Sequence, residues 1–281
     1  MIKTVGVIGA GTMGHGIAQV FAQNGFEIQL QDVSAAALAR AQGSIEKSLG
    51  KFVEKGKLQA GDRDAALARL HPATDLDALR DVDFVVEAAI EDETVKSDLF
   101  RRLDALTRPD VILASNTSSI SITRLGACTS RPGRVLGMHF MNPPPLMPLV
   151  EIIRGHASSS ETVQTVVELC KRLGKTPVEA ADYPGFIANR VLMPMINEAI
   201  FCVMEGVGTA DAVDSVMKLG MNHPIGPLAL ADLIGLDVCL AIMNVLHEGL
   251  GDPKHRPCPL LKRMVAAGLL GRKSGRGFYA Y

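Results

Sequence analysis

The chain has 281 residues, more than a single domain usually contains, so we expect either one large domain or two moderate ones and favour two. Hydrophobic residues make up 47% of the sequence and charged residues 21%, which is enough apolar material for a core and predicts a globular protein. The formal net charge of -1 leaves no overall field that would recruit nucleic acid or an anionic membrane.

Cysteine usage and hydropathy narrow the class further. The five cysteines include no close pair, so we expect neither a disulfide framework nor a metal site, and a reducing cytoplasm is favoured. A strand-like segment and a glycine loop follow Met1 directly, so we expect no signal peptide. The most apolar stretches are interrupted by Glu87, Asn197 or Asp232, so we expect no membrane-spanning segment.

The first elements along the chain form a strand, turn, helix and strand. Residues 4–9 read as a short buried strand, and residues 12–24 carry the spacing of a helix. Residues 27–31 read as a second strand that ends at Asp32. This order is typical of the opening unit of a doubly wound parallel sheet.

Strand and helix patterns continue to alternate after this unit. Further strands are predicted at residues 84–87, 111–114, 135–140 and 149–153, and helices at residues 35–55, 94–106 and 122–125. A helix at 161–173 and a short strand at 176–179 complete a predicted first domain, residues 1–184. The fold class is therefore predicted as α/β, with a doubly wound and mostly parallel sheet.

The remainder of the chain has a different pattern. From Phe186 onward, Leu, Met, Ile and Ala recur at helical intervals, with Pro- and Gly-containing breaks at residues 222–227 and 249–259. Residues 185–281 are therefore predicted to form a second, all-helical domain.

Residues 9–14, with the sequence Gly-Ala-Gly-Thr-Met-Gly, match the G-x-G-x-x-G pattern of Rossmann-type dinucleotide binding. Gly9 permits the tight turn, Gly11 leaves room for a pyrophosphate, and Gly14 lets the helix pack against the sheet. The helix start at Thr12 and Met13 offers free amides and the positive end of the helix dipole to that diphosphate. Because the pattern lies between a strand and a helix, a merely structural turn is the weaker interpretation.

Asp32 indicates which dinucleotide is bound. It lies 18 residues after Gly14, at the tip of the second strand, where a carboxylate can accept hydrogen bonds from ribose hydroxyls. The same charge would repel a 2′-phosphate, and the next three residues include no arginine, so NAD is favoured over NADP. The glycine motif alone also fits FAD.

His139 and Glu151 are the candidate catalytic pair. His139 lies near the end of the predicted strand at 135–140, at the carboxyl edge where doubly wound folds bind ligands. Prolines at 143–145 end that strand, and a chain reversal there would return Glu151 beside His139. A base held by a carboxylate accepts a hydroxyl proton while hydride leaves the adjacent carbon. A histidine at a strand end, considered alone, is more often a structural hydrogen-bonding group.

Six segments carry a resemblance to a known family. They are residues 9–14, 114–119 (Ala-Ser-Asn-Thr-Ser-Ser), 139–144 (His-Phe-Met-Asn-Pro-Pro), 149–151 (Leu-Val-Glu), 185–190 (Gly-Phe-Ile-Ala-Asn-Arg) and 271–279 (Gly-Arg-Lys-Ser-Gly-Arg-Gly-Phe-Tyr). Together they resemble the short, monofunctional 3-hydroxyacyl-CoA dehydrogenases, of which the bacterial 3-hydroxybutyryl-CoA dehydrogenases are the most similar form. The segments occur in order over essentially the whole chain.

The resemblance implies roles for individual residues. His139 would be the base and Glu151 its partner, while Ser118 and Asn189 would hydrogen-bond the reacting end of the substrate. Asn189 without the resemblance is more simply a helix cap or a core amide. The NAD contacts that the resemblance implies, beyond the glycine loop, are Asp32, Glu91, Lys96, Asn116, Ser118, Asn142 and Lys273.

Coenzyme A requires cationic partners for its phosphates. Lys47, Lys51 and Lys55 recur every four residues on one predicted helix, a spacing that is usually just a solvated face. The resemblance implies CoA contacts at Ser48 and Lys55 and leaves Lys47 and Lys51 undecided.

Two other functions fit parts of the pattern. A dehydrogenase of free β-hydroxyacids resembles this chain in domain order but uses a catalytic lysine, which residues 185–190 lack. A non-catalytic NAD(H) sensor would keep the fold without needing the His139 and Glu151 pair. The resemblance favours the acyl-CoA dehydrogenase, with an acyl-CoA thioester as substrate and a homodimer formed through the helical domain.

Overall fold

The computed structural model describes residues 2–281, and its backbone contacts divide the chain after Asp182 into two compact units. The sequence places the boundary two residues later, after Pro184. The second unit begins at Tyr183 and runs to Tyr281.

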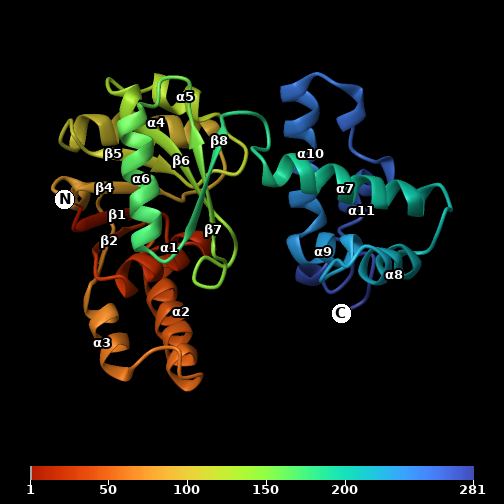
Figure 1. Ribbon diagram of the computed structural model, residues 1–281, viewed down its shortest axis with the longest axis horizontal. Helices are drawn as coiled ribbons and strands as arrows, with labels where there is room; N and C mark the ends of the chain where they lie inside the picture. Colours follow the sequence, from red (N-terminus) through yellow and green to blue (C-terminus); the bar gives the residue numbers. More distant parts are fainter. Residues whose placement is uncertain (1) are drawn as a thin grey trace. The chain divides into compact units, whose positions relative to one another are not determined.

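The first unit is built on one eight-stranded sheet, which Figure 1 shows with helices packed against it. Every neighbouring pair of strands is parallel except β6 and β7, which are antiparallel, so the predicted doubly wound and mostly parallel sheet is confirmed. In spatial order the strands are β3 (Leu70–Ala73), β2 (Glu27–Gln31), β1 (Thr4–Ile8), β4 (Phe84–Glu87), β5 (Ile112–Ser115), β6 (Val135–Phe140), β7 (Leu149–Arg154) and β8 (Thr176–Ala181).

Helices cover both faces of this sheet. The helices of the first unit are α1 (Thr12–Gln23), α2 (Ala35–Glu54), α3 (Ala60–Ala68), α4 (Glu93–Leu106), α5 (Ile122–Ala127) and α6 (Ser160–Arg172), with short 3-10 turns at η1 (Leu76–Leu79) and η2 (Pro132–Arg134). Apolar side chains of α1, α2 and α6 share one core with alternate strand residues such as Val5 and Val7. Figure 1 shows α6 crossing in front of the strands, in agreement with its contacts to β6, β7 and β8.

Four of the six α-helices of the first unit begin at a capping side chain. Ser34, Asp92, Ser121 and Ser159 each accept a hydrogen bond from a backbone N–H in the first turn of α2, α4, α5 and α6, respectively. Such caps satisfy amides that have no partner within the helix, which is why these boundaries fall within one residue of the predicted positions.

Two regular elements of this unit have no counterpart among the predicted ones. Helix α3 and strand β3 occupy residues 60–73, a stretch to which the sequence pattern assigned nothing. The strand reads Leu-His-Pro-Ala, which has no apolar run and contains Pro72. It is tolerated because β3 is the edge strand, where an absent backbone N–H leaves no neighbour unpaired.

The second unit is helical, as predicted. Its elements are α7 (Ala188–Met204), α8 (Ala210–Gly220), α9 (Pro227–Ile234), α10 (Leu236–Leu250), α11 (Pro259–Ala266) and the 3-10 turns η3 (Pro253–His255) and η4 (Arg272–Ser274). Their apolar faces, including Met193, Leu228 and Leu246, form a separate core. Two isolated bridges involving Arg276 are its extended contacts among the described residues.

Buried Asp232 ties the end of the chain to this bundle. Its carboxylate on α9 accepts hydrogen bonds from the backbone N–H groups of Phe278 and Tyr279, at 3.0 and 2.9 Å. Asp214 on α8 accepts from the Tyr279 hydroxyl at 2.8 Å. The terminal segment is therefore part of the packed unit.

The length and hydropathy of the helices were compared with those of a membrane-spanning segment. Across residues 2–281, no single helix is both long and apolar enough to cross a membrane, and only α9 and α10 taken together, bent by 99°, meet the test of length and composition.

Candidate active site

The glycine loop connects β1 to α1 at the carboxyl edge of the sheet, the context that the sequence predicted. Gly9 has a φ of 91°, a conformation that L side chains rarely adopt. A Cβ on Gly14 would lie 1.7 Å from the Gly9 carbonyl oxygen, so only glycine allows the helix to approach the turn this closely. A Cβ on Gly11 would meet no described atom within 4 Å, because it would point into open space.

That open space is a cavity of about 590 Å³ beside the loop. Gly9, Gly11, Thr12 and Met13 line it together with Asp32, as a bound diphosphate requires. No side chain among the described residues caps α1, so its first amides face a site suited to an anion. These residues fit the pyrophosphate and ribose of NAD.

Asp32 is held in place by the backbone on both sides. Its Oδ2 accepts from the Ala10 N–H at 2.8 Å and its Oδ1 accepts from the Ser34 N–H at 2.9 Å. Each carboxylate oxygen keeps a second lone pair, which a ribose hydroxyl can use. The charge of Asp32 also disfavours an additional phosphate at this position.

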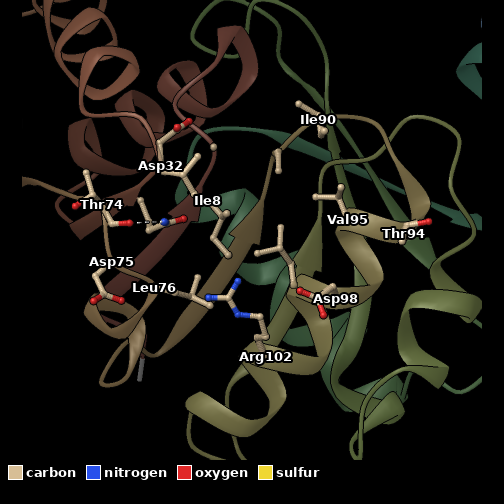
Figure 2. A pocket seen from close by; sticks show the side chains of 15 residues that line it. Ile8, Asp32, Thr74, Asp75, Leu76, Ile90, Thr94, Val95, Asp98 and Arg102 are labelled. Atoms are coloured by element: carbon tan, nitrogen blue, oxygen red, sulfur yellow. Dashed lines mark hydrogen bonds between the residues drawn. The ribbon is translucent and has the colours of Figure 1, made fainter.

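A second cavity, of about 700 Å³, opens on the other side of Asp32 and is shown in Figure 2. Ile8, Leu76, Ile90 and Val95 give it apolar walls, and Figure 2 shows Asp32 in the upper left and Arg102 in the lower centre of the view. Both cavities are lined by Gly9, Asp32, Ala89 and Ile90, so they adjoin at the loop. A planar apolar group attached to a ribose, such as adenine, suits this second cavity.

Sequence reasoning identified Gly9 and Asp32 but not the other residues that line this cavity. Thr74, Asp98 and Arg102 line it but belong to no motif. The spacing of Asp98 and Arg102 by four residues on α4 was an available signal, although it is equally typical of an ordinary solvated helix face.

His139 and Glu151 meet, so the predicted chain reversal is confirmed. They are direct partners in the antiparallel register of β6 and β7, and His139 Nδ1 lies 2.8 Å from Glu151 Oε2. His139 is 8% exposed and Glu151 is 2% exposed, so the pair is largely shielded from water. With Nδ1 donating to the carboxylate, Nε2 carries the lone pair that can accept a proton.

Four predicted cofactor residues are connected by contacts of the loop after β5: Asn116 and Ser118 lie in that loop, Glu91 follows β4, and Lys96 lies on α4. Asn116 Oδ1 accepts from the Phe140 N–H at 2.9 Å, which ties the loop to the end of β6. Glu91 accepts from the Ser118 N–H at 3.0 Å. Lys96 is 1% exposed, and its ammonium lies 2.5 Å from Glu87 and 3.4 Å from Glu91. Contact of these residues with NAD stays a prediction.

Asn142, another predicted NAD contact, lies two residues after the end of β6. It precedes Pro143 through a cis peptide bond, at the start of the segment that leads from β6 to β7. Its predicted contact with NAD remains untested.

The predicted lysine stripe borders a cavity. The cavity has a volume of about 510 Å³ and is lined by Lys47, Ser48 and Lys51 of α2, by Lys55 at the C-cap of that helix, and by Pro143, Pro145 and Leu146. Phe52 contributes an apolar surface between the lysines. A stripe that faces a groove differs from a purely solvated face, and it suits a long ligand that carries phosphates.

The second unit contains the two remaining predicted residues. Asn189 is buried in the first turn of α7, three residues after Phe186, and Gly185 and Phe186 have positive φ values of 77° and 48°. Lys273 lies in η4, and its ammonium pairs with Asp237 at 2.6 Å. Their predicted roles toward the substrate and NAD are not tested by this geometry.

We also searched the described residues for side chains that could bind a metal ion. Within residues 2–281, no group of three or more His, Cys, Asp or Glu side chains is positioned to hold a metal ion.

A dinucleotide loop on a doubly wound sheet, with a shielded imidazole and carboxylate at the same edge, defines a nicotinamide-dependent dehydrogenase. Residues 4–183 match the family model described as 3-hydroxyacyl-CoA dehydrogenase, NAD binding domain, and residues 185–281 match 3-hydroxyacyl-CoA dehydrogenase, C-terminal domain. The chain belongs to the 3-hydroxyacyl-CoA dehydrogenase family. The resemblance noted in the sequence and the predicted cofactor, NAD, are both confirmed.

Individual relatives agree with this assignment along the whole chain. A probable 3-hydroxybutyryl-CoA dehydrogenase of Deinococcus radiodurans is 60% identical over 98% of this chain and 99% of its own length. The mitochondrial hydroxyacyl-coenzyme A dehydrogenase of Homo sapiens is 42% identical over 100% of this chain and 92% of its own. The crystal structure of (S)-3-hydroxybutyryl-CoA dehydrogenase from Ralstonia eutropha superposes with a TM-score of 0.97 at 50% identity, covering 100% and 99% of the two chains.

Proposed function

We propose that the protein interconverts a short-chain (S)-3-hydroxyacyl-CoA, principally 3-hydroxybutyryl-CoA, and the 3-oxoacyl-CoA, with hydride transfer to or from NAD. Family membership supports the reaction, and the names of its bacterial relatives support the short acyl chain. The single observation on which the chemistry rests is the contact between His139 and Glu151.

In this proposal His139 is the general base for oxidation. Its Nε2 accepts the proton of the 3-hydroxyl, while Nδ1–H remains hydrogen-bonded to Glu151. The resulting imidazolium is stabilised by the Glu151 carboxylate, which is not itself protonated. When NAD is bound, its nicotinamide ring supplies the acceptor for the hydride that leaves carbon 3.

Two further residues are proposed to orient the substrate. The Ser118 hydroxyl can both donate and accept, so it can hold the reacting oxygen in line with His139. The Asn189 amide donates to the thioester carbonyl, where negative charge increases during the reaction. His139, Glu151, Ser118 and Asn189 are thus the proposed catalytic set.

The groove beside α2 is the proposed site for coenzyme A. Lys55 and Ser48 would contact the phosphate-bearing part of the ligand, and Phe52 and Leu146 offer apolar surface to its remaining length. A free hydroxyacid carries a single carboxylate and no phosphates, so it could not occupy the several lysines and the apolar surface of this groove together, and the groove favours a thioester substrate over a free acid.

The test compares acetoacetyl-CoA with free acetoacetate as oxidants of NADH. We expect rapid turnover of the thioester only, and a decrease of about 10²- to 10⁴-fold for His139→Gln with NADH affinity nearly unchanged. Equal use of the free acid would favour the β-hydroxyacid dehydrogenase, and tight NADH binding without oxidation would favour a sensor.

Lys55→Ala probes the groove, with Lys171→Ala as its control because Lys171 pairs with Glu168 on an exposed face of α6. We expect a higher KM for acetoacetyl-CoA in the first variant and no change in the second.

Assembly and location complete the proposal. We propose a homodimer formed through the helical unit, whose large exposed apolar side chains, among them Val191, Val207, Leu219 and Met221, a second copy of the chain would cover. Light scattering on the eluted protein should give twice the chain mass, and Leu219→Asp should reduce the measured mass.

A cytoplasmic location is proposed from the free cysteines and tested by fractionation.

A further inference from the structure

A polar network with a buried centre contacts the turn that carries Ser118, residues 117–119. The proposed mechanism assigns no role to its most deeply buried member. That member is Glu87, the last residue of β4, with an exposed fraction of 0%. The network extends from Glu87 through Lys96 and Ser115 to residues 117–119. Its contacts indicate what Glu87 does.

Glu87 uses both carboxylate oxygens. Oε1 accepts from Lys96 Nζ at 2.5 Å and from the Ala89 N–H at 2.7 Å. Oε2 accepts from the Ser115 hydroxyl at 2.6 Å, and that hydroxyl oxygen accepts in turn from the Thr117 N–H at 3.2 Å. One route from Glu87 therefore reaches the start of the Ser118 turn through Ser115.

A second route runs through Lys96 and Glu91. Lys96 Nζ lies 3.4 Å from Glu91 Oε2, and Glu91 Oε1 accepts from the Thr117 hydroxyl, the Ser118 N–H and the Ser119 hydroxyl. Burial acts to raise the pKa of the Glu91 carboxyl, but Lys96 and these three donors outweigh it and hold the pKa below its usual range. Glu91 thus remains a charged acceptor for these three donors of the turn.

This arrangement is costly as a purely structural device. Burying the Glu87 carboxylate and the Lys96 ammonium removes their hydration, and apolar side chains of similar size often stabilise a fold as well or better. What the ionic network provides instead is directional contact. The route through Ser115 ends on Thr117, and the route through Glu91 ends on Thr117, Ser118 and Ser119. Both routes therefore reach the turn whose central residue is Ser118.

The sheet register explains why Glu87 can serve both routes. Glu87 of β4 is paired with Ser115 of β5, so the two side chains lie side by side at the carboxyl edge. Lys96 reaches the same point from the first turn of α4, which begins at Glu93. A residue that anchors a strand end, a helix and a loop is well placed to set the position of that loop.

We propose that Glu87 is a positioning residue, which sets the place and orientation of the Ser118 hydroxyl through Lys96 and Glu91 on one route and through Ser115 on the other. The inference rests on the proposed function, because it assumes that Ser118 contacts the reacting groups. A misplacement of about 1 Å at such a group can reduce turnover by about 10²-fold.

The experiment compares Glu87→Gln with Glu93→Gln. The first variant keeps the shape of the side chain and removes its charge. The second removes a charge on α4, the helix that carries Lys96, where Glu93 pairs only with the exposed Arg124 at 3.0 Å among the described residues. Two quantities are measured: kcat for acetoacetyl-CoA reduction, and the hydrogen-exchange rate of the Ser118 amide in the NAD-free enzyme, with the Val7 amide of β1 as an internal reference.

For Glu87→Gln we expect kcat to fall about 10-fold or more and Ser118 exchange to rise about 10-fold, with Val7 exchange nearly unchanged. Glu93→Gln should match the wild type in both measurements. The proposal is overturned if Glu87→Gln alters only one of the two quantities, alters neither, or accelerates Ser118 and Val7 exchange equally.

A second pair of variants keeps the test decisive if Glu87→Gln does not fold. Thr117→Val removes the hydroxyl that donates to Glu91 and should reproduce the kinetic and exchange effects, whereas Thr117→Ser retains that hydroxyl and should restore wild-type behaviour. If the wild-type protein fails to reduce acetoacetyl-CoA, the proposed function fails. If it succeeds and the variants equal it, only the positioning role fails.

Discussion

Replacing Glu151 with Gln removes the charge of the proposed dyad while leaving its shape. Glu151 is 2% exposed and accepts from His139 Nδ1 at 2.8 Å, so the substitution neither opens a cavity nor exposes apolar surface. Its main effect falls on the imidazolium that forms when the substrate proton is transferred. The glutamine can also turn its amide toward Nδ1 and favour the tautomer in which Nε2 is protonated.

The expected size of the effect follows from the geometry. Two unit charges about 4 Å apart interact by ~4 kcal/mol at an effective dielectric constant of about 20, and ~1.4 kcal/mol corresponds to a factor of about ten in rate. Because the imidazolium charge is only partly developed in the transition state, we expect kcat to fall about 10²- to 10³-fold.

The assay is steady-state reduction of acetoacetyl-CoA, followed by loss of NADH absorbance, together with fluorescence titration of NADH binding. Glu27→Gln is the matched control, because Glu27 also lies 2.9 Å from a histidine, His71, but on the exposed surface. We expect that control to keep wild-type turnover and both variants to bind NADH normally.

A Glu151→Gln enzyme that retains kcat within about threefold of the wild type would refute the reasoning. The carboxylate would then contribute to folding alone, and the base would require no negative partner. An equal loss in Glu27→Gln would instead show that the assay responds to general destabilisation.

Three other outcomes follow from the structure. Gly11→Ala should preserve the melting temperature but weaken NADH binding by about tenfold or more, since its methyl group enters the open cavity, whereas Gly14→Ala should fail to fold normally because of its approach to the Gly9 oxygen. Asp32→Ala should narrow the ratio of kcat/KM for NAD over NADP, and an unchanged ratio would mean that another residue reads the ribose. Because the folded-state pKa of Glu91 is lowered, its stabilising contribution is present above the unfolded value of ~4.3 and is lost as pH falls through the folded pKa; melting curves of wild type and Glu91→Gln should therefore converge in acid and stay apart near neutrality.

Much of the fold was predictable because its signals are local. Buried parallel strands are short apolar runs, capping residues such as Ser34 and Asp92 mark helix starts, and the glycine loop carries its own conformational demands. The edge strand β3 was not predicted, because its sequence carries no such local signal. It is stabilised by pairing with β2 rather than by any preference of Leu-His-Pro-Ala for strand structure.

Site residues divide in a similar way. The positions of His139 and Glu151 could be inferred because one strand, one proline-rich reversal and one returning strand bring them together within a short stretch of chain. The groove lined by Lys55 and the network around Glu87 could not be inferred in this way. They depend on how α2 and residues 143–146 come to line one cavity, and on contacts of β4 with β5 and α4, which no local pattern specifies.

The sequence by itself determined the family, the cofactor class and the order of elements, because short motifs and apolar periodicity are properties of neighbouring residues. Only the tertiary structure decided that Glu87, Lys96 and Glu91 form one connected support behind Ser118, and that a lysine stripe borders a cavity. The physical reason is that burial, charge pairing and cavity shape arise between segments distant in the chain, after the sheet has set their register.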